Sequence, residues 1–301
     1  MRTALITGAC GFVGRNLVYK LLESKYEIYA IDCAEASCFK DAPAVHYVKS
    51  NLSDINAIDI PENTCDVLYH LAWAGVRPEA RSDINVQKHN IDLCINAVEL
   101  AKRLGIKRVV FIGSTMEYCY NEEPICESSR PTPSNCYGST KIATRYICSQ
   151  LCRDYGIDFE YAVITSIYGP GREDNNVIYY CINKLLNGEI PELSECIQHW
   201  DFVHISDAVN ALKLIGERGV PYSFYAIGTG ENRRLRECID IISNLIDKNI
   251  PIKFGAVPYK NGLIANSAVN TKKLTEDTGY SPAYQFEIGI SEVIDFYKQN
   301  K

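Results

Sequence analysis

The first half of the chain alternates short apolar runs with stretches of helical periodicity, and this alternation limits the fold more than any other feature. Apolar runs predict buried strands over residues 3–9, 27–32, 45–48, 66–74, 107–114 and 159–165. Apolar residues at helical spacing separate these runs, from Val13 onward and over about residues 82–104 and 137–155. The pattern predicts an α/β fold whose doubly wound parallel sheet carries helices on both faces.

The glycine-rich segment TGACGFVG joins the first predicted strand to the first predicted helix. Its glycines, Gly8, Gly11 and Gly14, permit a tight turn and let the backbone approach a pyrophosphate at the positive end of the helix. Asp32 ends the second strand, 18 residues after Gly14, where its carboxylate can accept hydrogen bonds from an adenosine ribose. Together these residues predict a Rossmann-type dinucleotide-binding unit.

Two charged residues bear on which dinucleotide is bound. The carboxylate of Asp32 repels a 2′-phosphate and therefore favours NAD over NADP. Arg15 directly follows the last glycine and is within reach of a 2′-phosphate, which favours NADP instead. We interpret Arg15 as a solvated helix residue, so NAD is the predicted cofactor.

A tyrosine stands four residues before a lysine in three pairs, which are Tyr137/Lys141, Tyr180/Lys184 and Tyr297/Lys301. Only the first pair opens a helix that follows a predicted strand of the sheet, KRVVFIGS. That strand delivers Ser114 and Thr115 to the carboxyl edge of the sheet, where ligands bind in doubly wound folds. We therefore predict that Tyr137 and Lys141 face the cofactor and that the other two pairs serve surface or packing roles.

Proton transfer is the chemistry predicted for this pair. Lys141 lies one helical turn from Tyr137. From there it would bind the nicotinamide ribose and lower the pKa of the tyrosine by its charge. Tyr137 then takes a proton from a substrate hydroxyl as hydride leaves for the cofactor. Ser114 is predicted to hydrogen-bond the same hydroxyl.

Composition and charge weigh against several classes of protein. The net charge is -6, the pI is about 5.5 and no run of basic residues occurs. A nucleic acid or an anionic membrane is therefore not expected as the main partner. No stretch of about 18 apolar residues predicts a membrane span. The start, MRTALITGAC, is too short for a secretory signal, so a cytoplasmic location is expected.

The 13 cysteines are scattered, without a C-x-x-C motif or a Cys/His cluster at zinc spacing. No metal site is therefore predicted. The thiols are interpreted as small buried apolar side chains. Cys136 is the one thiol singled out, because it stands beside Tyr137.

These residues and their order resemble the extended short-chain dehydrogenase/reductase family, the NAD-dependent nucleotide-sugar epimerases, dehydratases and reductases. The resemblance covers nearly the whole chain through TGACGFVG, DVLYHLAWAG, FIGSTMEY, PTPSNCYGSTK, SIYGPG, WDFVHISD and TGYSPAYQFEIGI. It implies three catalytic residues, Ser114, Tyr137 and Lys141. It implies a cofactor-binding set of Gly8, Cys10, Gly11, Phe12, Val13, Gly14, Asp32, Asn51, Leu52, Leu71, Ala72, Ala74, Asn90, Tyr137 and Lys141, with His70 in the wall of the same cleft.

Several positions depart from the family pattern. Family dehydratases carry an acidic pair after the catalytic Ser or Thr, whereas this chain has Thr115 and Met116, which disfavours a dehydratase. Trp200 replaces an arginine that binds the nucleotide phosphates in many epimerases, and Ser166 replaces a frequent asparagine. The resemblance therefore does not identify the nucleotide sugar. The candidates for the missing positive charge are Arg172 and Arg233.

Two reactions at C4 of a nucleotide-diphosphate sugar fit one such site. A 4-epimerase oxidises C4 and returns the hydride to the other face, whereas a reductase of 4-keto-6-deoxy sugars consumes NAD(P)H. Asp32 favours the epimerase, while the WDF segment and the compact length favour the reductase. A non-catalytic dinucleotide sensor on the same fold is a third hypothesis, although such proteins typically lose the tyrosine or the lysine.

The resemblance further implies two interleaved units and a homodimer. The Rossmann unit would comprise residues 1–165 plus about 202–228, and a smaller α/β nucleotide-sugar region would comprise about 166–201 plus 229–301. The dimer would pair the long helices around the FIGS strand, although the same apolar stripes could face the sheet. The positions suited to this contact are Ile91, Ile95, Val98, Ile142, Tyr146 and Ser149.

Overall fold

A seven-stranded parallel sheet forms the centre of the computed structural model, which describes residues 2–35, 39, 42–77, 79–121, 123–172, 176–259 and 268–300. The strand order is β10-β6-β5-β4-β1-β2-β3. The strands are β1 (Thr3–Thr7), β2 (Glu27–Asp32), β3 (Val45–Lys49), β4 (Val67–His70), β5 (Arg108–Ser114), β6 (Asp158–Ile164) and β10 (Phe224–Ile227). The reversal of strand order beside β1 is that of a Rossmann-type sheet, so the predicted α/β class is confirmed.

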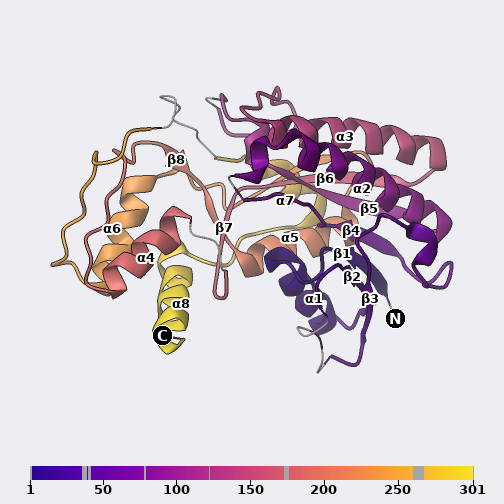
Figure 1. Cartoon of the computed structure of the whole chain (residues 1–301), viewed down its shortest axis with the longest axis horizontal. Helices are drawn as coiled ribbons and strands as arrows, with labels where there is room; N and C mark the ends of the chain where they lie inside the picture. The colour runs from indigo at the N-terminus through magenta and orange to yellow at the C-terminus, as the bar shows by residue number, and fades with distance from the viewer. Residues whose placement is uncertain are drawn as a thin grey trace.

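Helices cover both faces of this sheet (Figure 1). One face carries α2 (Ile84–Arg103) and α3 (Cys136–Tyr155), and the other carries α1 (Phe12–Glu23) and α5 (Ile205–Arg218). Each helix layer closes its own apolar core, because a strand that is buried on both faces sends alternate side chains into each layer.

Local sequence explains where the long helices start and stop. The side chain of Asn135 accepts a hydrogen bond from the Gly138 amide at 2.9 Å and caps the start of α3. Gly156 ends α3 with a φ of 66°, a left-handed conformation that favours glycine. The carboxylate of Asp83 caps α2 in the same way, 2.9 Å from the Asn85 amide. These caps position the first turn of α3, which carries Tyr137.

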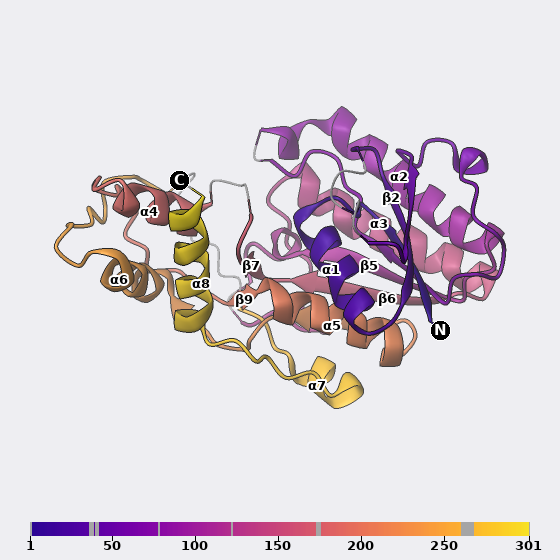
Figure 2. The same cartoon turned by 90° about the horizontal axis from the view of Figure 1, so that it is seen from below.

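The C-terminal part forms a separate apolar cluster beside the sheet (Figures 1 and 2). Its helices are α4 (Val177–Leu186), α6 (Leu235–Ile246) and α8 (Phe286–Gln299), and α7 (Lys272–Thr278) packs against α5 instead. Two short strand pairs lie outside the central sheet, and the first of them links the C-terminal part to the segment that leads into α5. They are the parallel pair β7 (Ser166–Tyr168) with β9 (Phe202–His204) and the antiparallel pair β8 (His199–Trp200) with β11 (Arg233–Arg234).

The chain therefore leaves the sheet after β6 and returns to it through β9, α5 and β10. The sequence pattern of residues 201–215 also predicts a strand followed by a helix, which correspond to β9 and α5, and that of residues 290–300 predicts an amphipathic helix, which corresponds to the larger part of α8. Sequence reasoning placed no element at α4, α6, α7 or β10. None of the described helices has the length and apolar character needed to cross a bilayer.

Candidate functional site

The glycine loop is a tightly packed bend between β1 and α1. Gly8 has a φ of +70°, and a Cβ atom there would lie 2.6 Å from the backbone nitrogen of Ala72. A Cβ atom on Gly14 would lie 2.1 Å from the Gly8 carbonyl oxygen. Gly11 precedes the first turn of α1, and no side chain caps that turn. The loop thus needs its glycines and leaves the first amides of α1 without a side-chain cap, as an anion site at a helix start requires.

Asp32 meets this loop from the end of β2. One carboxylate oxygen accepts a hydrogen bond from the Cys10 amide at 2.9 Å, and the other accepts one from the Ala34 amide at 3.0 Å. Each oxygen keeps a second lone pair, and Asp32 is only half-buried. The predicted acid and the predicted glycines therefore stand at one place on the carboxyl edge of the sheet.

The segment after β4 forms the next wall of this edge. The side chain of His70 is paired on both nitrogens, with Thr7 Oγ1 at 2.8 Å and Cys94 Sγ at 3.4 Å. Burial lowers its pKa to about 3, so the ring is neutral. The Leu71 amide donates to the Thr7 carbonyl at 3.1 Å. Leu71 and its neighbour Ala72 thus follow the glycine loop along the edge.

Asn90 reaches the same wall from α2. Its amide group pairs with both backbone groups of Ala74, at 2.8 and 2.9 Å, and it is buried. Asn51 and Leu52 follow β3. Asn51 is exposed, whereas Leu52 is buried in the core with a φ of 63°. Among the other predicted cofactor residues, Cys10, Phe12 and Val13 are half-buried in the glycine loop and the first turn of α1.

A dinucleotide fits these residues, because bare glycine backbone, uncapped helix amides and the Asp32 carboxylate converge on one edge. The interpretation of Arg15 as a solvated residue was wrong. Its guanidinium donates to the Gly171 carbonyl and lies 5.6 Å from the centre of the Phe12 ring. Arg15 is thus tied to the loop after β7.

Ser114 and Tyr137 come together at the adjoining end of β5. Ser114 is the last residue of β5, and Tyr137 stands in the first turn of α3. The two side chains are close enough for the Ser114 hydroxyl to act on the pKa of the Tyr137 phenol, which it lowers. Ser114 Oγ also accepts a hydrogen bond from the Met116 amide at 3.2 Å. The structure therefore brings the predicted hydroxyl pair together beside the glycine loop.

Lys141 lies one turn further along α3, with its side chain inside the protein. Its Nζ donates to the Ile112 carbonyl at 2.7 Å and lies 3.7 Å from the centre of the Trp73 ring. The same nitrogen is 5.9 Å from the centre of the Tyr137 ring. Burial lowers the pKa of Lys141 to about 8.

The pKa of Tyr137 is shifted in the direction opposite to the prediction. Burial raises it, while the hydrogen bond with Ser114 and the charge of Arg81 oppose that rise. The Arg81 guanidinium lies 5.7 Å from the centre of the Tyr137 ring. The expected lowering of this pKa is thus not found: the Lys141 ammonium lies beside the Tyr137 ring but donates its hydrogen bond to the Ile112 carbonyl of β5, and the charge of Arg81 is the one that opposes the rise.

Glu117 is a member of this site that the sequence interpretation missed. It is fully buried, and its Oε1 accepts hydrogen bonds from the Ser114 amide at 2.7 Å and the Tyr161 hydroxyl at 2.9 Å. Burial raises the pKa of Glu117 to about 7. The spacing Ser114-x-x-Glu117, typical of a capping box, was the signal that could have revealed it. Trp73, in contrast, lies in an irregular segment, and Arg81 lies in a single 3-10 turn (Ala80–Ser82), and no such pattern marks either residue.

The other two tyrosine–lysine pairs lie elsewhere. Tyr180 and Lys184 stand on α4, where Lys184 pairs with Glu189 at 2.5 Å and is partly exposed. The hydroxyl of Tyr297, on α8, donates to the Arg172 carbonyl at 2.6 Å, and Lys301 is outside the described residues. Within the described ranges, only Tyr137 and Lys141 stand together at the carboxyl edge of the sheet.

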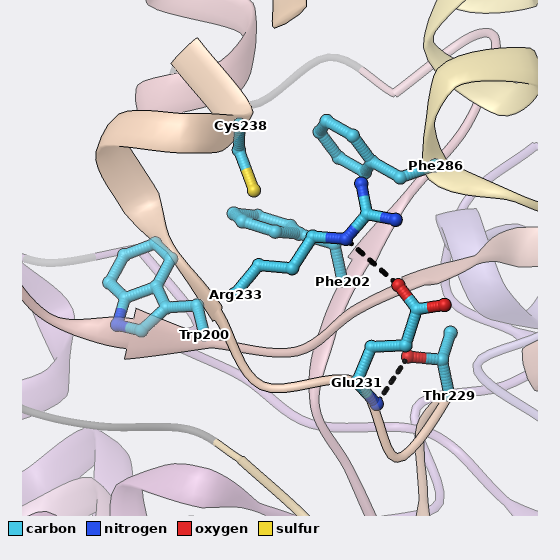
Figure 3. Close-up of a pocket in the computed structure, with 7 residues that line it drawn as sticks. All are labelled: Trp200, Phe202, Thr229, Glu231, Arg233, Cys238 and Phe286. Carbon is cyan, nitrogen blue, oxygen red and sulfur yellow. Dashed lines mark hydrogen bonds and ion pairs between the residues drawn. The ribbon is translucent and has the colours of Figure 1, made fainter. Parts of the chain in front are cut away.

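A separate pocket lies in the C-terminal part, between β8, β11 and the start of α8 (Figure 3). Three aromatic rings line it, those of Trp200, Phe202 and Phe286. Arg233 crosses this pocket and pairs with Glu231 at 2.9 Å and with Glu287 at 2.6 Å. The pocket combines three aromatic faces with a guanidinium that two carboxylates already pair, so a planar ring is the ligand group that its lining suits. Its remaining lining residues are Thr229 and Cys238.

Three further expectations concern side chains away from these pockets. In the described part of the chain, no group of three or more His, Cys, Asp or Glu side chains is placed to hold a metal ion. The cysteines reported there are free and mostly buried, and Cys136 is half-buried. His204 ends β9, is buried and stacks on Tyr284 with ring centres 3.9 Å apart. His204 is therefore a packed residue at the end of a strand.

Comparisons with known proteins agree with this architecture. A putative UDP-glucose 4-epimerase of Methanocaldococcus jannaschii is 25% identical over 98% of this chain and 98% of its own length. A UDP-N-acetylglucosamine 4-epimerase from Methanobrevibacter ruminantium, solved with UDP-N-acetylmuramic acid, superimposes with a TM-score of 0.89 at 22% identity, covering 100% of this chain and 99% of that one. A dTDP-glucose 4,6-dehydratase from Bacillus anthracis, solved with NAD, superimposes with a TM-score of 0.86 at 21% identity, covering 100% and 98%.

Epimerases and dehydratases that act on nucleotide sugars thus share this fold. A sequence model of one enzyme family matches residues 4–228, from β1 to the residue after β10. That range contains the glycine loop, Asp32, Ser114, Tyr137 and Lys141. The chain belongs to the NAD dependent epimerase/dehydratase family.

Proposed function

We propose that this protein is an NAD-dependent 4-epimerase of a nucleotide-diphosphate sugar. The observation that carries the proposal is the placement of Ser114, at the end of β5, and Tyr137, in the first turn of α3, beside each other at the same sheet edge as the glycine loop and Asp32. Two of the similar proteins are 4-epimerases by name, one of UDP-glucose and one of UDP-N-acetylglucosamine. They support the same reaction here.

The chain's residues divide the work as follows. The glycine loop and the first amides of α1 hold the pyrophosphate, and Asp32 holds the adenosine ribose. Bound NAD supplies a hydride acceptor at C4 of the sugar. Ser114 hydrogen-bonds the C4 hydroxyl, and Tyr137 accepts its proton and later returns it. Because burial raises the pKa of Tyr137, the phenol is protonated at rest, so its function as a base needs a nearby cation, from Arg81 or Lys141.

The C-terminal pocket is the proposed site of the nucleotide diphosphate. Trp200 occupies the position of a phosphate-binding arginine in the resembling enzymes, and in this chain Arg233 is its partner across the β8–β11 pair. We assign the missing positive charge to Arg233 rather than Arg172, whose guanidinium donates to the Ile167 carbonyl and lies 5.7 Å from the centre of the Phe12 ring. With this assignment, residues of about 166–201 plus 229–301 form the nucleotide-sugar region.

Substitution of Tyr137 tests the proposal. Tyr137→Phe removes the hydroxyl and should lower turnover by about 100-fold or more, while NAD binding persists. Tyr180→Phe is the matched control, because it removes a hydroxyl from a tyrosine of the same spacing on α4 and should leave turnover unchanged. Turnover of Tyr137→Phe near that of the wild type would remove this tyrosine from the mechanism.

A 4-ketoreductase is the second candidate, favoured by Trp200 in the C-terminal pocket and by a reductase activity in the name of a similar trifunctional enzyme of Arabidopsis thaliana. The two reactions differ in what happens to the cofactor. Denaturing the purified protein should release tightly bound NAD if it is an epimerase. A protein that is empty, or that holds only NADPH, would identify the reductase instead.

We further propose a homodimer through α2 and α3. On α3, Tyr146 is 61% exposed and Ile147 is 37% exposed, which leaves an apolar face for a partner. Val98 is fully buried among the core residues between sheet and helices, so that predicted contact was wrong. Ile91, Ile95, Ile142 and Ser149 are half-buried and remain available. Sedimentation that shows only monomer at micromolar concentration would refute the dimer.

A further inference from the structure

Trp73 contacts both Tyr137 and Lys141, the tyrosine–lysine pair of the candidate site. It follows β4 by three residues, and its indole is half-buried against the core under α2 and α3. One face of the ring lies 3.7 Å from Lys141 Nζ. The ring also meets Tyr137 edge-on, with centres 5.6 Å apart and planes at 78°. One side chain thus contacts both members of the pair.

Buried amides of α2 fix the position of this indole. Trp73 Nε1 donates to Gln87 Oε1 at 3.2 Å. Gln87 is fully buried, and its own amide nitrogen donates to the Ala80 carbonyl at 3.0 Å. Asn90 donates to the same Gln87 oxygen at 3.3 Å while it pairs with the backbone of Ala74. The segment that carries the indole is therefore held from both sides.

Lys141 needs such a partner. A lysine side chain is a flexible four-carbon stem with a strongly hydrated ammonium, and burial penalises its charged form. The hydrogen bond to the Ile112 carbonyl uses one of its three N–H groups. An indole face attracts a desolvated cation more strongly than any other aromatic side chain does. The ring thus favours the charged form where burial disfavours it.

We propose that Trp73 is a positioning residue that holds the Lys141 ammonium charged and beside Tyr137, and that it limits turnover through Lys141. This inference rests on the proposed function, in which Lys141 and Tyr137 serve catalysis. It assigns to the segment after β4 a role in the proton-transfer step that is separate from lining the cofactor cleft.

Substitutions that separate ring chemistry from volume test this role. Trp73→Leu keeps an apolar side chain but removes the ring face, and we expect kcat to fall by about 10- to 30-fold with KM changed less than about 3-fold. Trp73→Phe keeps a ring face, so its kcat should stay within about 3-fold of that of the wild type. Equal kcat for Trp73→Leu and Trp73→Phe would overturn the proposal.

The chain provides a matched control in a second lysine–ring contact. Lys102 Nζ lies 3.7 Å from the centre of the Tyr155 ring, at the far end of α3. Tyr155→Leu removes the same kind of contact at the same distance, and kcat should not change. A fall in kcat as large as that of Trp73→Leu would show a general effect of packing between α2 and α3, and would also overturn the proposal.

A double-mutant cycle tests whether Trp73 acts through Lys141. In a Lys141→Met background, adding Trp73→Leu should lower kcat by less than about 2-fold, because the ammonium that the ring holds is already absent. The same 10- to 30-fold fall in both backgrounds would place Trp73 outside the action of Lys141. Failure of this inference can be told apart from failure of the proposed function. In the second case Tyr137→Phe would keep the turnover of the wild type.

Fluorescence provides a readout that does not depend on turnover. The chain has 2 tryptophans, so Trp200→Phe leaves Trp73 as the only tryptophan, whose emission is excited selectively at the red edge of protein absorption. Adding Lys141→Met to that protein should change the emission, because a cation no longer lies on the indole face. Lys253→Met removes an exposed lysine and should leave the spectrum unchanged. An identical spectrum with and without the Lys141 ammonium would contradict the contact itself.

Discussion

Two strands, β5 and β6, connect two clusters of buried charge that differ in how their groups are paired. At the carboxyl ends, Glu117 accepts hydrogen bonds from Ser114 and Tyr161, and Lys141 donates to a carbonyl. At the amino ends, Glu160 is fully buried and neither of its oxygens accepts a hydrogen bond. Its nearest cation is Arg108, whose Nε lies 3.6 Å away.

The difference shows that a shifted pKa does not by itself locate a site. Burial raises the pKa of Glu160 to about 8, a larger shift than that of Glu117. A surface pocket also lies at the amino edge, but its charged side chains neutralise one another, as in the ion pair of Arg2 with Glu217 at 3.0 Å. Only the carboxyl edge combines shifted groups with glycine backbone and a hydroxyl pair. Convergence of donors and acceptors distinguishes the two edges.

The largest expected effect is on turnover, when one cation in each cluster is replaced by methionine. Lys141→Met should lower turnover by about 100-fold or more and change the free energy of unfolding by less than about 1 kcal/mol, because an apolar side chain replaces a buried charge. Arg108→Met should leave turnover per folded molecule within about 2-fold and lower the free energy of unfolding by about 2 kcal/mol.

Turnover and urea unfolding of both variants measure this contrast. The comparison fails if Arg108→Met folds normally but loses its turnover, because the amino edge would then take part in the reaction.

The next effect concerns the pH dependence of stability. The pKa of Glu160 is raised in the folded state from an ordinary 4.5 to about 8. Between these values the unfolded chain binds fewer protons than the folded one, so stability is complete below pH 4.5 and decreases as the pH rises towards 8. Glu160→Gln removes this titration. Relative to the wild type, its free energy of unfolding should rise by about 2 kcal/mol between pH 5 and pH 8.

Denaturant unfolding at both pH values, with Glu189→Gln as an exposed control, checks this expectation. If the free energies of unfolding of the wild type and Glu160→Gln change by the same amount between the two pH values, Glu160 is already ionised in the folded protein.

The smallest effect concerns the pH profile of the reaction. Burial lowers the pKa of Lys141, and the negative charge of Glu117 opposes this lowering. The pKa of Glu117 itself is raised by burial to about 7. Glu117→Gln keeps an acceptor for the Ser114 amide but removes the charge. Lys141 should therefore lose its proton at lower pH, and the alkaline limb of turnover should move down by roughly one pH unit.

Turnover measured across pH 6 to 10 tests this shift, with Glu127→Gln as a control outside the site. An unchanged alkaline limb would mean that Lys141 does not sense Glu117.

Sequence reasoning predicted the fold of the first half because its signals are local. Periodicity placed β1 to β6 and their helices, and the glycines marked the first turn. The second half was harder to place, because β8 and β11 have only two residues each and show no period. The helix α4 is short and largely apolar, and α6, although as long as α1 and amphipathic, follows only the two-residue strand β11. The partners of both helices lie far away in the chain.

The same division applies to the candidate site. Ser114, Tyr137 and Asp32 were found because each stands at the end of a strand or at the start of a helix. The partners of Lys141 and Arg15 were missed because they are backbone carbonyls, Ile112 and Gly171, which no residue type signals. Trp73 belongs to an irregular segment, and only the packing of α2 against α3 brings it to the pair.

The return of the chain to the sheet has a consequence for biosynthesis. The strand β10 pairs with β6, but β6 ends at Ile164 and β10 begins at Phe224. A nascent chain therefore emerges from the ribosome with one edge of β6 unpaired. The face of the sheet that α5 later covers is also exposed until the intervening segment has been translated. Unpaired strand edges bind other chains readily. We therefore expect the nascent chain to be most prone to association with other chains while the segment between these two residues is being translated.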